Sequence, residues 1–291
     1  MKTLCLTTSV VKLLMLHKKW LALLGLAIFL SACTKAPEYS IAQGRAGELQ
    51  FQVVYLPVTS NQTERRVVER VHSLLTHLEQ QLSSENAESE VARVNNWAQS
   101  SALVLTRDLE EFIRVGMSVD MLTEHGLSLF QKASQSPLPH VFVENHRLIK
   151  TDPSLKLTFD ALISGYAVDR IAVMMRQMGV VNYQITVNNQ RRSKRFRVMP
   201  VVNDIHAGQH IVDVEQEINA RSYALGYARS PNNAEVYVVY NSAAQASGLA
   251  QWLATMPVAE ALITADRLNL AVSIHSDAKD SGTRYNSAAF N

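Results

Sequence analysis

Cysteine is almost absent from this 291-residue chain, and both copies lie near its start. They are Cys5 and Cys33. Downstream of residue 33 no cysteine pair remains to form a disulfide, and no thiolate remains to bind a metal such as zinc. A domain formed by the rest of the chain must therefore depend on its hydrophobic core, which is feasible because 47% of the residues are hydrophobic.

Several familiar catalytic patterns are missing too. The sequence shows no glycine-rich phosphate loop, and no Ser-His-Asp arrangement stands out. Among the histidines, only His206 and His210 have a spacing that two metal ligands could use. Because Gly208 between them favours a loop that leads into a strand, a chance pair is the simpler interpretation.

Acidic residues are absent from the first 32 positions, which carry four lysines. The apolar run over residues 21–30 is too short to cross a bilayer, which needs about 20 apolar residues. A basic start, a short apolar run and small residues at the cut are typical of a cleavable signal. Residues 1–32 are therefore predicted to be a signal peptide. Its start is either Met1 or Met15, because residues 15–33 form a complete signal by themselves.

This leader ends in Leu30-Ser31-Ala32-Cys33, a pattern at which lipoprotein signals are cut. The thiolate of Cys33 can accept a diacylglycerol group and hold the protein on a membrane. We expect the mature protein to begin at lipidated Cys33 on the periplasmic face of a bacterial membrane, and Thr34 after the cysteine favours the outer membrane. The alternatives are an ordinary signal with a chance cysteine, or an uncleaved anchor.

Charge argues against nucleic acid as a partner. Removal of the four leader lysines leaves 24 of the 28 basic residues and all 26 acidic ones, so the net charge changes from +2 to −2. One basic run remains, at residues 191–195 (RRSKR). It could form a basic binding patch, but a solvated hairpin turn between two strands is the more ordinary interpretation.

Hydrophobic periodicity predicts a single compact α+β domain over residues 49–291, without internal repeats, preceded by a lipidated tether over residues 33–48. Helices are expected at residues 63–82, 107–122, 165–178, 243–255 and 258–266, the third stopping at Gly179. Strands are expected at residues 49–56, 141–143, 148–149, 183–187, 196–202, 210–214, 235–240 and 268–274, with a turn at Asn145. Residues 83–99 are expected to form a loop with a short helical turn.

Three stretches together resemble one protein family. Residues 157–171 (LTFDALISGYAVDRI) resemble the central motif of the periplasmic FAD:protein FMN transferases, the ApbE-type lipoproteins, in which a run such as L-D-L-x-x-I-A-K-G-Y-A-V-D-R joins a strand to a helix. Ser242-Ala243 resembles the opening of the C-terminal helix. Upstream, six residues resemble the family's flavin-side signature, an L-S-x-x-x-x-x-S-E-[LIV]-x-x-x-N pattern: Leu82, Ser83, Ser89, Glu90, Val91 and Asn95. The resemblance covers the mature chain in order and implies the family's T-fold-like α+β domain.

The resemblance also implies candidate flavin-binding residues: Ser89, Glu90, Asn95, Gly165, Tyr166 and Asp169. For three of them a structural role is an alternative. Gly165 is expected at the strand-to-helix turn, where it would allow close packing. Tyr166 could belong to the core. Asp169 could instead complement the positive end of its own helix, if it lies in the first turn.

The family's reaction implies a magnesium site. Moving FMN from FAD to a threonine hydroxyl cleaves a pyrophosphate, and a Mg²⁺ ion with oxygen ligands neutralises the charge that develops on the phosphate oxygens. The family's ligands are an Asp and a Thr four residues apart on the C-terminal helix, and a backbone carbonyl within the A-K-G segment. Side chains at i and i+4 share one helix face, so that spacing suits a common ion.

This sequence departs from the pattern at most of those positions. Ser247 and Gln251 stand at the Asp and Thr ligand positions, and Ser164 stands at the A-K-G lysine. Elsewhere Asn188-Asn189-Gln190 replaces a Gly-Gly-Glu turn, residues 123–128 (TEHGLS) replace T-G-G-A-F-D, Glu85 replaces an aromatic residue, and an H-x-x-D-P-x-T-G segment is missing. Scaffold positions persist, whereas positions that bind metal and phosphate have changed.

The resemblance implies FAD and Mg²⁺ as ligands, but without an anionic ligand Mg²⁺ would be held only weakly. We therefore expect a membrane-anchored member of this family that does not transfer FMN and that uses its scaffold for weak flavin binding or for contact with periplasmic or envelope proteins. The first alternative is an active Mg²⁺-dependent FMN transferase whose carboxylate ligand comes from elsewhere, such as Asp160 or Asp213. The second is a structural lipoprotein of unrelated fold, which the order of the motifs disfavours.

Overall fold

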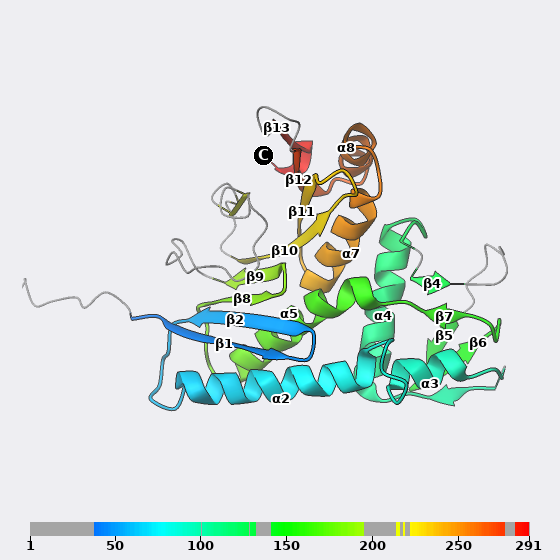
Figure 1. The fold of residues 1–291 in the computed structure, drawn as a ribbon, viewed down its shortest axis with the longest axis horizontal. Coiled ribbons are helices and arrows are strands. Elements are labelled where there is room, and N and C mark those ends of the chain that lie inside the picture. The colour runs from blue at the N-terminus through cyan, green and yellow to red at the C-terminus, as the bar shows by residue number, and fades with distance from the viewer. Residues whose placement is uncertain are drawn as a thin grey trace, which may run out of the picture. The chain divides into compact units, whose positions relative to one another are not determined.

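A single antiparallel sheet organises the part of the chain that the computed structural model describes, namely residues 38–99, 101–127, 129–131, 141–194, 214–215, 218, 222–276 and 283–290 (Figure 1). Its strands follow the order β1-β2-β8-β9-β10-β11-β12-β13. They are β1 (Ser40–Ala46), β2 (Leu49–Tyr55), β8 (Tyr183–Val187), β9 (Gln190–Lys194), β10 (Ser222–Arg229), β11 (Glu235–Tyr240), β12 (Ala271–Ser276) and β13 (Thr283–Asn286).

The predicted boundary between tether and domain is wrong. Residues 40–46 were expected in the tether, but they form β1, which pairs with β2 along its whole length from Ser40↔Tyr55 to Ala46↔Leu49. Ala42 and Ala46 are buried by this pairing and by α2. The compact unit accordingly starts at Tyr39 and continues to Asn291. Alternation in a short, small-residue strand is a weak signal, which is why β1 was missed.

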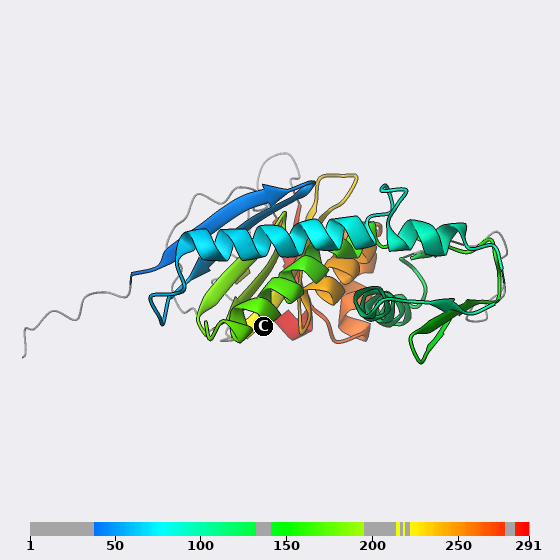
Figure 2. The same cartoon turned by 90° about the horizontal axis from the view of Figure 1, so that it is seen from below.

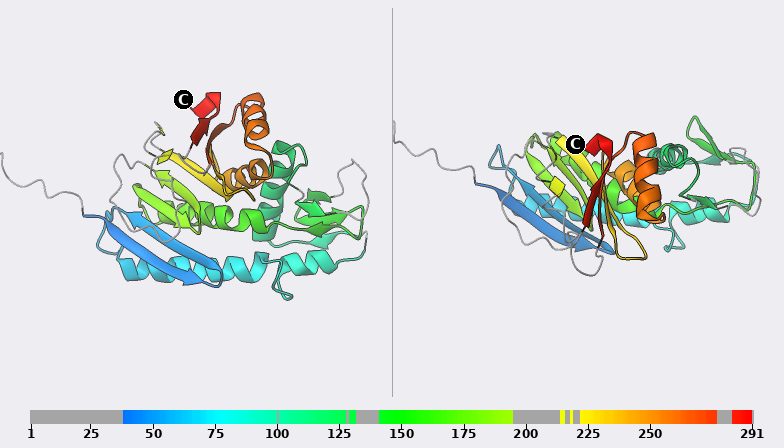
Figure 3. Two further views of the ribbon diagram at one scale, coloured as in Figure 1. Left: turned by 45° about the horizontal axis from the view of Figure 1, so that its top comes forward. Right: turned by 90° about the horizontal axis from the view of Figure 1, so that it is seen from above.

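Helices α2, α5 and α7 cover one face of the sheet (Figures 1 and 3). The helices of the described chain are α2 (Glu64–Leu82), α3 (Glu90–Asn96), α4 (Arg107–Leu122), α5 (Asp160–Gln177), α7 (Ala243–Ala254) and α8 (Val258–Arg267), with a 3-10 turn at Ala288–Phe290. As predicted, Thr63 caps α2, because its side chain accepts a hydrogen bond from the amide of Arg66. The apolar stripe of α2 is fully buried: Val67, Val71, Leu75, Leu78 and Leu82.

A second group of short strands lies beyond the far end of α2, beside α3 (Figure 2). It consists of a small sheet, β3 (Leu103–Val104), β6 (Arg147–Lys150) and β5 (Val141–Glu144), and of the pair β4 (Phe130–Gln131) and β7 (Lys156–Leu157). The predicted hairpin is confirmed. Asn145 and His146 both have positive φ, at 50° and 59°, the conformation of a type I′ turn.

Most predicted elements that the structure describes are confirmed within three residues. Helix α5 begins at Asp160 and not at Gly165, and besides β1 the strands β3, β4, β9, β10 and β13 were not predicted. The basic run is not a solvated turn, because residues 191–194 lie inside β9 between β8 and β10. Residues 134–139, 196–202 and 210–213 lie outside the described residues. In the described part of the chain, no helix is long and apolar enough to cross a membrane.

Candidate functional site

The part of the sequence that best matches the family motif, around Gly165, lies where α5 meets α7. Gly165 is inside α5, so its predicted place at a strand-to-helix turn is wrong, but its predicted role in close packing is confirmed. A Cβ atom there would lie 2.4 Å from the carbonyl oxygen of Ala243 and 2.8 Å from the Cα of Ala244. On the other side of α7, a Cβ on Gly226 of β10 would lie 2.1 Å from the carbonyl group of Ala246. Two glycines therefore allow α7 to pack directly against both α5 and the sheet.

Asp169 fixes the start of α7. It lies in the third turn of α5, so the idea that it complements the N-terminus of its own helix is wrong. Its carboxylate instead accepts hydrogen bonds from the Ser242 hydroxyl at 2.7 Å and from the Ala244 amide at 3.1 Å, both at the N-terminus of α7. Arg192 of β9 pairs with its other oxygen at 2.5 Å. Asp169 therefore complements the positive N-terminal end of α7, the neighbouring helix. Its carboxylate joins α5, α7 and β9.

Ser247 makes a direct contact between α7 and α5. Its side chain is buried, with 1% of the residue exposed, and its hydroxyl donates a hydrogen bond to the carbonyl oxygen of Ala161 at 2.7 Å. Gln251, four residues later, is exposed. The two positions that the sequence alignment paired therefore differ in environment, and the buried one is already satisfied within the protein.

The altered turn between β8 and β9 is likewise bonded to its surroundings. Asn188 has φ 50° and donates its amide to the Ser164 hydroxyl at 2.9 Å, while its side-chain oxygen accepts from the Gln50 amide at 3.1 Å. Gln190, which is buried, pairs through both side-chain atoms with the backbone N–H and C=O of Tyr227 at 2.9 Å. These substitutions form a hydrogen-bonded set that joins β2, α5, β8 and β10.

The residues of the flavin-side signature hold α3 in place. Ser89 caps α3 by accepting from the Ala92 amide at 2.9 Å, and Glu90 accepts a hydrogen bond from the Thr106 hydroxyl. Asn95 pairs with the backbone of Leu157, accepting from its N–H at 2.7 Å and donating to its C=O at 3.1 Å. The signature therefore ties α3 to the start of α4 and to β7, the strand that leads into α5.

Tyr166 belongs to the core, one of the two roles that the sequence left open. It is 2% exposed and its ring lies 4.9 Å from that of Phe112. Burial, and then the nearby Glu111 carboxylate, raise the pKa of its hydroxyl, which has no hydrogen-bond partner in the described structure. Such a hydroxyl stays protonated at neutral pH.

Asp160 and Asp213 are the two carboxylates that could replace the missing metal ligand, and the structure describes only Asp160. Asp160 occupies the first turn of α5, and its two carboxylate oxygens lie 2.7 and 2.8 Å from the Ser84 hydroxyl. Asp213 lies outside the described residues, as do His206 and His210. Among the described residues, no cluster of three or more His, Cys, Asp or Glu side chains is arranged to hold a metal ion.

Comparison with known proteins decides the family. The sequence profile of the ApbE family matches residues 48–193, half of the chain. The chain belongs to the ApbE family. A curated relative, the FAD:protein FMN transferase of Vibrio cholerae serotype O1, is 20% identical over 203 residues, an alignment that spans 61% of each protein.

Solved structures of the ApbE family share the fold. The flavin transferase ApbE from Vibrio cholerae has a TM-score of 0.67 at 18% identity and covers 87% of this chain and 98% of its own. The flavinyl transferase ApbE of Pseudomonas stutzeri, in its apo form, also has a TM-score of 0.67, at 17% identity, covering 87% of this chain and 96% of its own. The predicted α+β, ApbE-type fold is confirmed.

Arginine contacts are what sequence reasoning missed at this site. Arg191 of the basic run is buried, 2% exposed, and pairs with Glu215 at 2.6 Å, and Arg192 binds Asp169. The first two arginines of the run are therefore engaged within the protein. The only signal in the sequence that could have indicated a strand here is the two-residue period of side-chain direction. It places Arg191 and Ser193 on the same, buried side of β9.

The segment that replaces T-G-G-A-F-D keeps a backbone suited to glycine. Glu124 and His125, at the two glycine positions, have φ of 51° and 65°, a region that costs side-chain-bearing residues about 1 kcal/mol or more each. Both side chains have hydrogen-bond partners: Arg267 of α8 binds Glu124 through two hydrogen bonds of 2.5 and 2.9 Å, and the Asp120 carboxylate lies 2.6 Å from the His125 ring. Two residues with side chains therefore adopt a left-handed backbone at positions where the family motif has glycine.

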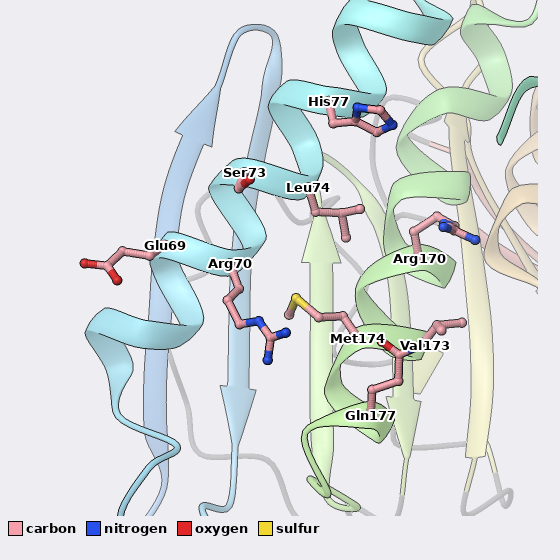
Figure 4. A pocket seen from close by; sticks show the side chains of 9 residues that line it. All are labelled: Glu69, Arg70, Ser73, Leu74, His77, Arg170, Val173, Met174 and Gln177. Carbon is pink, nitrogen blue, oxygen red and sulfur yellow. The ribbon is translucent and has the colours of Figure 1, made fainter. Parts of the chain in front are cut away.

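A groove of about 500 Å³ runs between α2 and α5 (Figure 4). Arg70, His77 and Arg170 line it together with apolar Leu74 and Met174. Arg170 is engaged by Glu111 at 3.0 Å and by Asp108 at 3.3 Å. None of the predicted flavin or metal positions lines this groove.

Proposed function

We propose that this protein is a lipid-anchored member of the ApbE family that does not transfer FMN, and that it retains the scaffold for weak flavin binding or for contact with envelope proteins. The observation that carries the proposal is the contact between Ser247 and Ala161. At the position where the family places an anionic metal ligand, a neutral hydroxyl donates its hydrogen to a backbone carbonyl at 2.7 Å. This hydroxyl carries no negative charge, and its hydrogen is already donated within the protein.

The donor set around this contact does not fit Mg²⁺. A hard, strongly hydrated cation needs several oxygen ligands, usually including carboxylates, to compensate for its dehydration. The Ser247 hydroxyl and, beside the β8–β9 turn, the hydroxyl of Ser164 and the amide of Asn188 are neutral. The Asp169 carboxylate at the same helix contact already binds Ser242, Ala244 and Arg192. Asp160, the acidic residue next to Ala161 in sequence, accepts a hydrogen bond from the Ser84 hydroxyl. No step of pyrophosphate cleavage is therefore assigned to this chain.

The proposal predicts no covalent flavin product. When the purified full chain is incubated with FAD, excess Mg²⁺ and an acceptor peptide containing the target threonine, we expect no flavin fluorescence on the acceptor. Loss of one preorganised charge-stabilising group costs about 10²–10³ in rate, and several such groups are replaced here. The Vibrio cholerae transferase serves as positive control in the same assay. Acceptor labelling by this chain above the no-enzyme background would overturn the proposal and favour the active alternative.

Anchoring is tested separately, because it rests on the leader and not on the site. Replacing Cys33 by serine removes the only thiolate that can be acylated after signal cleavage. We expect Cys33→Ser to abolish labelling with palmitate and to shift the protein out of the membrane fraction or leave it unprocessed. The matched control is Cys5→Ser within the leader, which should fractionate like the wild type. If Cys33→Ser is still palmitate-labelled and membrane-bound, the lipoprotein proposal is wrong.

A further inference from the structure

One end of the sheet carries an exposed apolar tip, formed by the ends of the three adjacent strands β1, β2 and β8. Tyr39 precedes β1, Val58 follows β2 and Val181 precedes β8. Their exposed fractions are 36%, 63% and 39%, and they make up three of the nine large hydrophobic residues that the described structure leaves exposed. Clusters of this kind on a soluble surface often mark a contact with another molecule.

The tip is rigid because a buried glutamine holds its two loops together. Gln62, 5% exposed, accepts the Val58 amide at 2.5 Å and donates to the carbonyl oxygen of Met178 at 2.6 Å. The Leu56 amide donates to the carbonyl oxygen of Asn182 at 3.1 Å. Val58 and Val181 are thus presented on a fixed backbone, and their exposure is not the result of a loose loop.

The chain upstream limits what can cover this tip. Cys33 and Ser40 are seven residues apart, and a chain of that length spans at most about 25 Å. If Cys33 is acylated, as proposed above, Ser40 and the tip beside it remain within that distance of the bilayer surface, whatever path the intervening residues take. The small sheet with β3, β5 and β6 lies beyond the opposite end of α2 (Figure 2).

Basic side chains flank the tip. The first turn of α2 and the last turn of α5 carry three exposed arginines, Arg65, Arg66 and Arg176, and one exposed carboxylate, Glu64. Arg65 pairs with exposed Glu69 at 2.8 Å, which leaves Arg66 and Arg176 as the arginines that a lipid phosphate would meet. Arginine near an anionic lipid surface strengthens peripheral binding. The two acyl chains of a diacylglycerol already anchor a protein stably, so a contact from the protein would set the orientation of the domain rather than its retention.

We infer that this tip docks onto the surface of the phospholipid bilayer, with Val58 and Val181 inserted among the headgroups and the arginines above them. The inference rests on the proposed lipid anchor. Docking would fix the orientation of the domain, holding the ends of β1, β2 and β8 at the membrane and directing the small sheet away from it.

The test uses the lipidated full chain in vesicles of phosphatidylethanolamine and phosphatidylglycerol. Because Cys33 is consumed by the lipid, a new cysteine can be labelled alone: Val58→Cys or Val181→Cys with an environment-sensitive fluorophore, and Val104→Cys as matched control. Val104 is a valine of similar exposure, 60%, on β3 of the small sheet. We expect lipids with brominated acyl chains to quench the label at 58 and 181 at least about twofold more than at 104.

The outcomes separate the two proposals. Equal quenching at all three positions in a palmitate-labelled, membrane-bound protein would overturn the docking inference and leave the anchor standing. A blue shift at position 58 without lipid quenching would mean that protein, such as a second copy, covers the tip, and would also overturn it. Absence of palmitate and of the protein from the membrane fraction would overturn anchor and docking together.

Discussion

Gly165→Val should lower the free energy of unfolding by about 3 kcal/mol, the upper end of what overpacking usually costs. The reason is that the added Cβ would lie 2.4 Å from the backbone oxygen of Ala243, and backbone cannot rotate away as a side chain can. On the other side, α7 is held by its contact at Gly226 of β10, so it cannot retreat without losing that packing. We expect the thermal midpoint to fall by roughly 6–12 °C for a domain of this size.

Two further variants keep this prediction testable if Gly165→Val fails to fold. Gly165→Ala adds the Cβ alone and should show a smaller loss in the same direction, despite the better helix propensity of alanine. Arg176→Val places valine at an exposed position of the same helix and should cost no more than about 0.5–1 kcal/mol through helix propensity. A Gly165→Ala protein as stable as the wild type would show that α5 and α7 are not in close contact.

Ser247→Asp should destabilise the protein strongly in the absence of divalent cations and should make its stability depend on Mg²⁺. The position is 1% exposed, and a carboxylate there would face the carbonyl oxygen of Ala161 in place of the hydroxyl that now donates to it. An uncompensated buried charge costs about 3–5 kcal/mol. A cation that binds between carboxylate and carbonyl removes that penalty, and ligand at 100 times its Kd adds about 2.7 kcal/mol.

The measurement is a thermal unfolding series with EDTA or Mg²⁺. Ser247→Ala should lose about 1 kcal/mol, the value of one hydrogen bond, with no response to Mg²⁺. Gln251→Asp, one turn later on the exposed face of α7, should change stability by less than about 0.5 kcal/mol. Adding Gln251→Thr to Ser247→Asp should improve the Mg²⁺ response without restoring FMN transfer, because Ser164 and the β8–β9 turn remain changed. A wild-type midpoint that rises with Mg²⁺ would contradict the argument that this site does not hold the ion.

Local patterns in the sequence were sufficient for the elements with strong periodicity or clear end signals. Helix α2 follows from its apolar spacing and from Thr63, helix α4 was placed to the residue, and Gly179 ends α5 with φ 79° as a C-terminal glycine does. The turn at Asn145 followed from a residue that tolerates positive φ between two short apolar runs. In each case the cause lies within a few residues of the effect.

The errors arose where a partner distant in sequence decides the outcome. Arg191 was expected in solvent because charge is usually exposed, yet Glu215 compensates its burial. Asp169 was placed at the start of α5 because the matched motif joins a strand to a helix. The residues before Gly165 are helical here, and the acceptor role of Asp169 is toward α7, 75 residues away. Edge strand β1 owes its place to pairing with β2 rather than to its own composition.

By itself, the sequence determined the family membership that the motif order indicated, and it supports the predictions of a leader with Cys33 and of replaced metal ligands, because these depend on residue identity and order. Only the tertiary structure decided what the replacements do. Ser247 reaches the backbone of Ala161 across 86 positions and Asn188 reaches the side chain of Ser164 across 24, so the substituted groups find partners within the protein. The physical reason is that a buried polar group must find a partner, and the fold, not the local sequence, determines which partner is within reach.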